Sequence, residues 1–157
     1  MFGIRKGQGA TEYLVLLAVV LVIALVSIAL LGVFPSFSTD TKINQSKTYW
    51  QAASPISIVD VGAASGGTLT VIMRNAGPDT IIIANGTATL TPSGTAVPMA
   101  TLLSSTLGAG ATTTATFGIP ACTTGQLVEY DMVFSYNTAS LTGINQTGSR
   151  PVSLKCS

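Results

Sequence analysis

The chain has 157 residues, of which 47% are hydrophobic and 8% are charged, and its formal net charge is +1. Soluble domains carry about 25% charged residues, so this is not the composition of a cytosolic protein, and without a basic excess nucleic acid is not the expected main partner. Histidine is absent, which removes the commonest general base and metal ligand near neutral pH. We therefore expect no enzyme, no metal, no cofactor and a single compact head.

The first predicted element is a membrane helix. The run from Leu14 to Phe34 is apolar apart from alanine, glycine and a single serine, Ser27. About 20 such residues, at 1.5 Å each, span the roughly 30 Å core of a bilayer. Arg5 and Lys6 precede the run, so the positive-inside tendency places the N-terminus in the cytoplasm and everything after the helix outside.

The residues just before this helix carry a more specific signal. From Arg5 to Tyr13 they read RKGQGATEY: a short basic leader, a Gly-Gln pair, and one acid, Glu12, at the mouth of the apolar run. A carboxylate drawn into hydrocarbon costs free energy, so an acid at this place is functional by default. The stretch resembles the class III signal peptide of archaeal type IV pilins, which a membrane-embedded prepilin peptidase cuts between glycine and glutamine.

The resemblance implies a set of roles for these residues. Cleavage would fall between Gly7 and Gln8, so that residues 1–7 are a leader and Glu12 is the fifth residue of the mature chain. Glu12 would then pair with the new α-amino group of Gln8 on a neighbouring subunit and so set the assembly register. Identical subunits, inserted in the membrane as precursors, would be built by pilus assembly machinery into a helical surface filament for adhesion, with helices in its core and heads as its sheath.

Two other interpretations remain open. The helix could be the tether of a monomeric, membrane-anchored surface adhesin or binding module. The chain could also be an archaellin-type subunit of a motility filament. Archaellins usually have a glycine-rich start without the Glu12-Tyr13 pair found here, which makes them the lesser alternative.

A second helix is predicted after Pro35, which ends or kinks the first because it has no amide hydrogen. Over residues 36–53, Phe37, Ile43 and Trp50 are compatible with one apolar helical face. The other possibility is an extended Ser/Thr linker. Ser54-Pro55 then stops the helix. This predicts a helix and stalk over residues 8–53 and an extracellular head over residues 54–157.

The head shows the pattern of short strands separated by turns. Asn85-Gly86 is the dipeptide most typical of a two-residue hairpin, so we expect a turn between strands at residues 81–84 and 87–90. The fold class expected is α+β: a long N-terminal hydrophobic helix followed by an antiparallel immunoglobulin-like β-sandwich. The other expected strands cover residues 56–61, 68–73, 97–103, 112–119, 127–136 and 152–155.

The only two cysteines, Cys122 and Cys156, lie in the distal half without a CxxC spacing. Zinc and covalent haem are therefore not indicated. An extracellular location would let the two cysteines pair, and the bridge would close a loop of about 35 residues. We expect this disulfide to fix the last strand to the sandwich.

Three of the five asparagines stand in N-x-S/T sequons, where chance predicts a little over one. Asn44 and Asn145 are the better candidates for glycosylation. Asn85 is less favoured, because it lies in the expected tight turn.

No catalytic constellation is evident. Glu129 and Asp131 alternate on one expected strand, and a solvated strand face explains them better than a general acid and base pair. The chain has no phosphate-binding glycine motif. Core packing or subunit contact is the commonest use of scattered aromatic residues, here Tyr49, Trp50, Tyr130 and Tyr136.

Overall fold

The computed structural model describes residues 8–31, 34–91 and 93–157. The predicted cleavage position is half outside this set: Gly7 is not described, whereas Gln8 is the first residue of α1 (Gln8–Leu31). By its internal contacts the chain forms two units, Met1–Thr39 and Asp40–Ser157. The first six residues of α2 (Phe34–Ala52) thus belong to one unit and its other thirteen to the second.

α1 is the predicted apolar helix. Its segment Gly9–Leu30 is long and apolar enough to cross a membrane, with a mean hydropathy of 3.1 and no buried residue. Leucine and alanine have high helix propensity. The lower propensity of the many valines matters little, because in an apolar environment every backbone amide and carbonyl must be hydrogen-bonded and a helix satisfies them all. At 1.5 Å per residue, the 24 residues of α1 extend over about 36 Å.

α2 confirms the helix predicted over residues 36–53. Pro35 lies in its first turn, where a residue without an amide hydrogen is tolerated because that hydrogen would have no partner within the helix. The helix ends at Ala52, and Ser54-Pro55 follows, as the sequence indicated. Among the side chains of the second half, Ser46 and Trp50 are buried.

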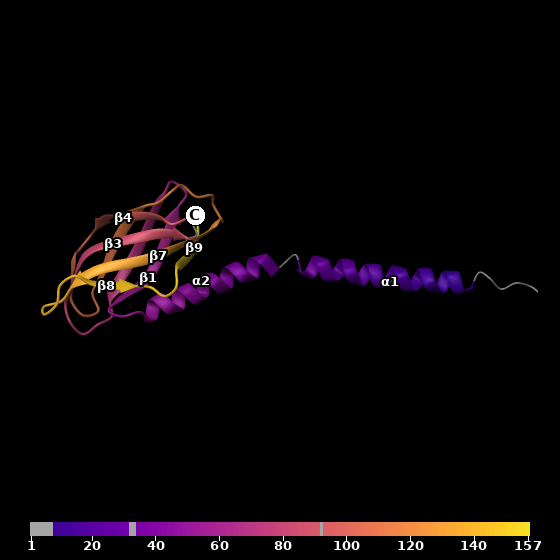
Figure 1. Cartoon of the computed structure of the whole chain (residues 1–157), viewed down its shortest axis with the longest axis horizontal. Helices are drawn as coiled ribbons and strands as arrows, with labels where there is room; N and C mark the ends of the chain where they lie inside the picture. Colours follow the sequence, from indigo (N-terminus) through magenta and orange to yellow (C-terminus); the bar gives the residue numbers. More distant parts are fainter. Residues whose placement is uncertain (1–7, 32–33, 92) are drawn as a thin grey trace, which may run out of the picture. The chain divides into compact units, whose positions relative to one another are not determined.

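The head is an antiparallel β domain, which confirms the fold class (Figure 1). Its strands form one sheet in the order β1-β2-β6-β4-β3-β7-β8, with β5 paired to β3 and β9 paired to β7. The nine strands found within the described residues are β1 (Ile56–Ala64), β2 (Thr68–Asn75), β3 (Ile81–Thr91), β4 (Thr95–Leu102), β5 (Thr106–Leu107), β6 (Thr112–Gly118), β7 (Leu127–Asn137), β8 (Ile144–Thr147) and β9 (Val152–Lys155).

The sheet is folded into two layers that share β4. Thr95–Pro98 of this strand pair with β3, and Met99–Leu102 pair with β6, with a register shift between Met99 and Thr101. The two ends of the folded sheet meet at a single parallel bridge between Ala63, on β1, and Cys156. Within the described residues no other ladder pair joins β1 to β9, so a gap remains between these two strands, which we call the seam.

The core lies between the two layers, and alternation along the strands fills it. In β7 every second side chain from Val128 to Tyr136 is buried, while Glu129, Asp131 and Ser135 lie on the outer face. The same alternation buries Leu69, Val71 and Met73 of β2 and Thr113, Ala115 and Phe117 of β6. The largest side chains with almost no exposed surface are Trp50, Tyr130, Phe117 and Phe134, so α2 contributes one of the main core residues.

The hairpin predicted at Asn85-Gly86 is wrong. β3 is one strand from Ile81 to Thr91, with a register shift between Ile83 and Asn85 opposite β7. Gly86 is buried, and a Cβ there would come within 3.1 Å of the Phe134 ring. The glycine thus allows the Phe134 ring to pack closely at an irregular point of the strand, where a larger residue would require the ring to shift.

Candidate assembly site

The first part of the candidate site is α1. Every side chain from Gly9 to Leu30 is exposed in the chain, and Glu12 is the only charged one among them. Glu12 lies four residues after Gln8, about one helical turn from the start of the helix. The hydroxyl of Ser27 donates a 2.7 Å hydrogen bond to the carbonyl oxygen of Ile23, so this polar group is already satisfied within the helix. A helix that is apolar on every side is stable only inside lipid or among other apolar surfaces.

The second part is the attachment of α2 to the head, which centres on Trp50. This side chain is 1% exposed, and its ring packs edge-on against Phe134 with centroids 6.3 Å apart. Its Nε1 donates a 3.1 Å hydrogen bond to the carbonyl oxygen of Arg150. Gly148 makes room for the ring, because a Cβ at this position would collide with it. Trp50 is thus both a core residue and a polar anchor.

Ser46, one turn before Trp50, binds the free edge of β9. Its hydroxyl donates to the carbonyl oxygen of Pro151 over 2.8 Å and accepts from the amide of Ser153 over 2.9 Å. On the other side of the seam, the Gln51 side chain donates a 3.3 Å hydrogen bond to the carbonyl oxygen of Val59 on β1. Side chains of α2 therefore take the place that a neighbouring strand would have in a closed sheet.

Two further pairs fix α2 to the same segment of the head. The Tyr49 hydroxyl accepts a 2.9 Å hydrogen bond from the Ser149 amide. Hydrogen bonding by Ser149 lowers the pKa of the phenol below 10.0, and the side chain of Ser149 contributes more to this than its backbone. The Arg150 guanidinium donates to the Gln45 side chain over 3.1 Å. Arg150 therefore contacts α2 through its side chain as well as through its carbonyl oxygen.

Ion pairs join α2 to the strands at the end where β7 begins. Lys155 lies 2.7 Å from Asp40, and Lys42 lies 3.6 Å from Glu129. Glu129 is 22% exposed and the other three side chains are about half exposed, so solvent screens both pairs and each contributes less than about 1 kcal/mol. Glu129 also accepts a 3.0 Å hydrogen bond from the Ser153 hydroxyl, whereas Asp131 accepts one of 2.9 Å from Thr91. The two acids have separate structural partners, and burial raises the pKa of Tyr130 between them.

A cavity of about 310 Å³ remains beside the seam, walled by α2, β1 and β9. Its lining is mostly apolar, with Lys47 and Asp60 among the residues around it. In the part of the chain that the structure describes, no group of three or more acids and cysteines could hold a metal ion.

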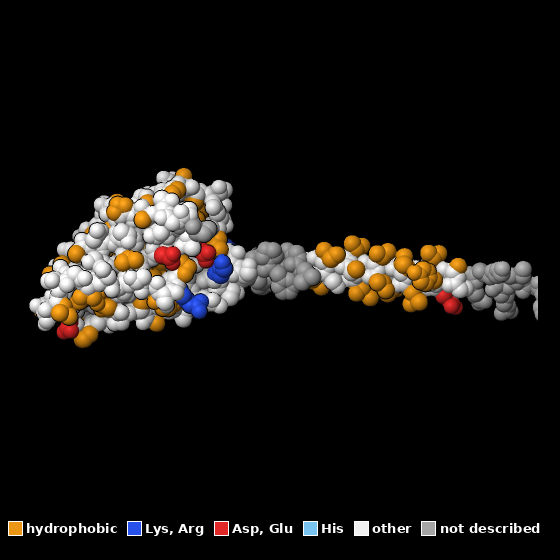
Figure 2. Space-filling view, viewed as in Figure 1, with side chains coloured by type: hydrophobic (Ala, Val, Ile, Leu, Met, Phe, Trp, Pro, Cys, Tyr) orange, Lys and Arg blue, Asp and Glu red, His pale blue; other side chains and the backbone are white. Residues whose placement is uncertain are grey.

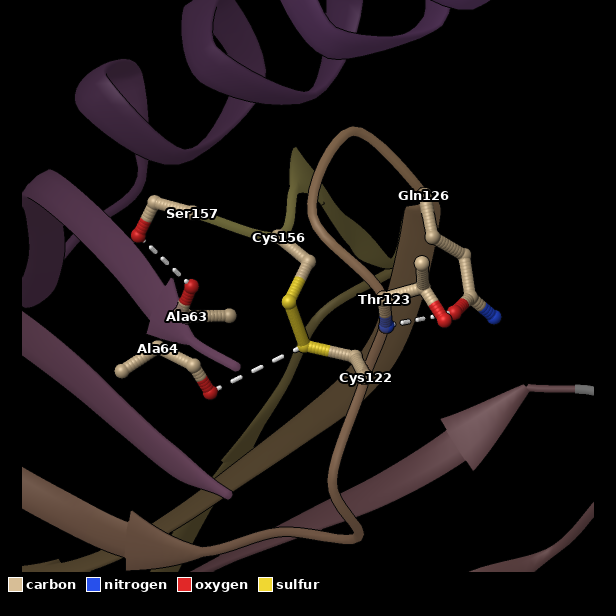
Figure 3. The surroundings of a disulfide bond; sticks show 7 residues. All are labelled: Ala63, Ala64, Cys122, Thr123, Gln126, Cys156 and Ser157. Atoms are coloured by element: carbon tan, nitrogen blue, oxygen red, sulfur yellow. Dashed lines mark hydrogen bonds between the residues drawn. A yellow bond between two sulfur atoms is a disulfide. The ribbon is translucent and has the colours of Figure 1, made fainter. Parts of the chain in front are cut away.

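Cys122 and Cys156 form a disulfide, with Cα atoms 6.1 Å apart (Figure 3). Cys122 lies in the loop before β7, and its sulfur is 3.7 Å from the carbonyl oxygen of Ala64. The Ser157 amide donates to the carbonyl oxygen of Ala63 over 2.8 Å. The disulfide therefore lies beside the backbone bridge between Ala63 of β1 and Cys156, and it holds the C-terminus there.

We expect the disulfide to stabilise the head by about 3–4 kcal/mol, because it closes a loop over a sequence separation of 34 residues. The double substitution of Cys122 and Cys156 by serine should therefore lower the free energy of unfolding of a fragment covering residues 40–157 by that amount. Trp50, the only tryptophan, reports unfolding through its fluorescence in denaturant. Reduction of the unsubstituted fragment is the control and should have the same effect; an unchanged unfolding midpoint in both would contradict the prediction.

The sequon asparagines occupy three different elements. Asn44 is exposed on α2, Asn85 is exposed on β3, and Asn145 is exposed on β8. The reason for disfavouring Asn85 no longer holds, because the expected turn is absent at this position.

Sequence reasoning missed Ser46 and Gly148 as parts of the attachment. A signal for Ser46 was present, since it lies between Ile43 and Trp50 at helical spacing on the buried face of α2. None was present for Gly148, whose role depends on a ring that lies about a hundred residues earlier in the chain.

Comparison with solved structures finds several distant likenesses, including the following two. The archaellum periplasmic stator protein FlaG from Sulfolobus acidocaldarius is 16% identical, with a TM-score of 0.41, and the match covers 59% of this chain and 97% of that one. The complex of the stator proteins FlaF and FlaG from the same organism matches at 15% identity and a TM-score of 0.42, over 61% of this chain and 90% of that chain. Likeness at this level assigns no function. No protein-family model matches the sequence, and no curated protein matches it.

Proposed function

We propose that this protein is the major structural subunit, a pilin, of an archaeal type IV pilus-like surface filament used for adhesion, and that it is not an enzyme. The observation that carries the proposal is α1, whose side chains from Gly9 to Leu30 are all exposed although only Glu12 among them is charged. Such a surface must be covered by lipid before assembly and by other copies of α1 after it.

The transfer of α1 from lipid to the filament core involves little change in free energy. Lipid is about as apolar as leucine, so moving α1 from the bilayer to a bundle of equal helices is close to neutral and depends on packing and on the assembly machinery. The precursor is inserted with its N-terminus in the cytoplasm, because Arg5 and Lys6 precede the span. The heads are then outside, where disulfides persist, and they form the sheath of the filament.

In this proposal Glu12 and Gln8 specify the register of the core. Removal of the leader gives Gln8 a cationic α-amino group, and the Glu12 carboxylate of a neighbouring subunit pairs with it. Either charge alone is costly in an apolar core, whereas the pair is tolerated. The pairing therefore disfavours subunits that are displaced along the filament axis.

Electron microscopy of material sheared from the cell surface tests the proposal. Filaments decorated by an antibody to the head, and absent from cells that lack the gene, are expected. Restriction of the protein to the membrane fraction of cells that make no such filament would support the monomeric anchored module instead. Loss of swimming with normal surface attachment in the deletion strain would support a motility filament.

Processing gives a separate prediction. The surface form should begin at Gln8 and contain 157 − 7 = 150 residues. Mass spectrometry of N-terminal peptides from purified filaments checks this, and substitution of Gly7 by a bulky residue such as isoleucine should leave the leader attached and the protein in the membrane. Assembled filaments that still carry the Met1 peptide would contradict it.

A further inference from the structure

Two of the three sequons lie side by side in the folded head. β7 is flanked by β3 on one side and β8 on the other (Figure 1). Asn85 of β3 is paired in register with Ser135 of β7, and Ser135 is paired in register with Asn145 of β8. The three residues thus form one row across three adjacent strands.

This row lies on the outer face of the sheet. The neighbours of Ser135 along β7, Phe134 and Tyr136, are buried, so Ser135 is directed to the opposite face, and directly paired residues share a face. Asn85 and Asn145 are both exposed, and they line one shallow hollow of about 180 Å³ that also includes Ser135. Two strand spacings separate them, which is about 10 Å.

The local structure leaves both side chains suited to modification. The Asn85 side-chain oxygen accepts a 2.7 Å hydrogen bond from the Gly86 amide, which engages the oxygen and not the nitrogen that would carry a sugar. Asn145 lies on β8, a strand of four residues at the end of the sheet order. Charged side chains in Figure 2 gather mainly toward the end of the head where β7 begins. None of the residues that line the hollow is charged.

We infer that the outer face of β3, β7 and β8 is one glycan-bearing surface, with oligosaccharides attached to both Asn85 and Asn145. The donor class is a lipid-phosphate-linked oligosaccharide. The side-chain nitrogen forms a bond to the anomeric carbon, the bond from that carbon to the phosphate oxygen breaks, the lipid phosphate leaves, and the amide proton passes to a base of the transferase.

The second half of the inference rests on the proposed filament: there this face points to solvent and not to a neighbouring head. A specific protein contact needs about 800 Å² of surface on each partner. Two hydrated oligosaccharides about 10 Å apart leave no continuous area of that size on the outer face of β3, β7 and β8. Contacts between heads must therefore use other faces of the sheet.

Mass spectrometry of the protein recovered from the surface of its own cells tests the modification. Asn85→Gln and Asn145→Gln should each lower the intact mass by one oligosaccharide, and the double variant should lower it by two. Asn44→Gln, on α2, is the matched control and should leave the peptides around Asn85 and Asn145 modified. An unmodified asparagine at either of these positions in the unsubstituted protein overturns the paired surface.

The orientation is tested by a thiol probe on the same face. In the double glutamine variant, Ser135→Cys should react with a maleimide-polyethylene glycol as fully in intact filaments as in detergent-dissociated subunits. Thr147→Cys, two residues beyond Asn145 on β8, is a second probe. Protection of both thiols in filaments overturns the solvent-facing orientation. Glycosylated protein in cells that make no filaments would overturn the filament and the orientation together, but would support the glycan-bearing surface.

Discussion

Substitution of Glu12 by glutamine should leave membrane insertion, leader removal and head folding unchanged and lower incorporation into filaments by about tenfold or more. The variant keeps the shape of the side chain and removes its charge, so in the proposed filament the α-amino group of Gln8 on the neighbouring subunit would lose its partner in an apolar core. Breaking a buried ion pair from one side costs about 3–5 kcal/mol, and about 1.4 kcal/mol already changes an equilibrium tenfold. Quantitative immunoblotting of sheared and cell-retained fractions measures the effect.

A matched control is available on the head. Asp60→Asn also removes one carboxylate, at an exposed position of β1, and should assemble normally. If Glu12→Gln gave the same filament yield as this control, Glu12 would serve only the N-terminal end of α1, one turn after its start, through the interaction of a carboxylate with the helix dipole.

The second large effect concerns where the head begins. A fragment of residues 40–157 should fold, whereas a fragment of residues 54–157, the head expected from the sequence, should be largely unfolded at room temperature. The shorter fragment lacks Trp50, whose truncation alone costs about 3–5 kcal/mol, and it leaves the Ser153 amide without the Ser46 hydroxyl. Domains of this size are stable by only about 5–15 kcal/mol, so these losses together use most of the margin.

Circular dichroism during heating distinguishes the two fragments. Trp50→Ala within residues 40–157 isolates the contribution of the ring and should lower the melting temperature clearly. Lys47→Ala, an exposed position on the same helix, should not. Equal melting temperatures for the two fragments would show that the strands are sufficient without α2.

The elements that the sequence predicted well are those whose physical cause is local. α1 follows from a continuous apolar run, and β2, β6 and β7 follow from alternation that the folded sheet confirms. The cysteines were also suited to pairing by number and location alone. None of these inferences required knowledge of which segments meet in space.

The failures have non-local causes. Gly86 is a glycine because Phe134 packs against it from another strand, and a turn is the more frequent reason for the same dipeptide. β8 has no apolar alternation by which the sequence could reveal it. It is held to β1 in part by the Gln146 side chain, which bonds both the amide and the carbonyl oxygen of Ile56. The buried role of Ser46 likewise depends on the free edge of β9, which the sequence of α2 does not contain.

The position of the disulfide has a mechanical consequence. A tensile load that enters the head through α2 passes to the segment ending in β9, because Ser46, Trp50 and Asp40 all bond to residues between Arg150 and Lys155. That segment is short and by hydrogen bonds alone would peel away from β7 one pair after another. Cys156 comes directly after this segment and is covalently joined to Cys122 in the loop before β7. The load is therefore finally carried by a covalent bond, which stays intact when the hydrogen bonds of the strand break. In the proposed filament, the disulfide would thus reinforce the head where a tensile load on β9 ends.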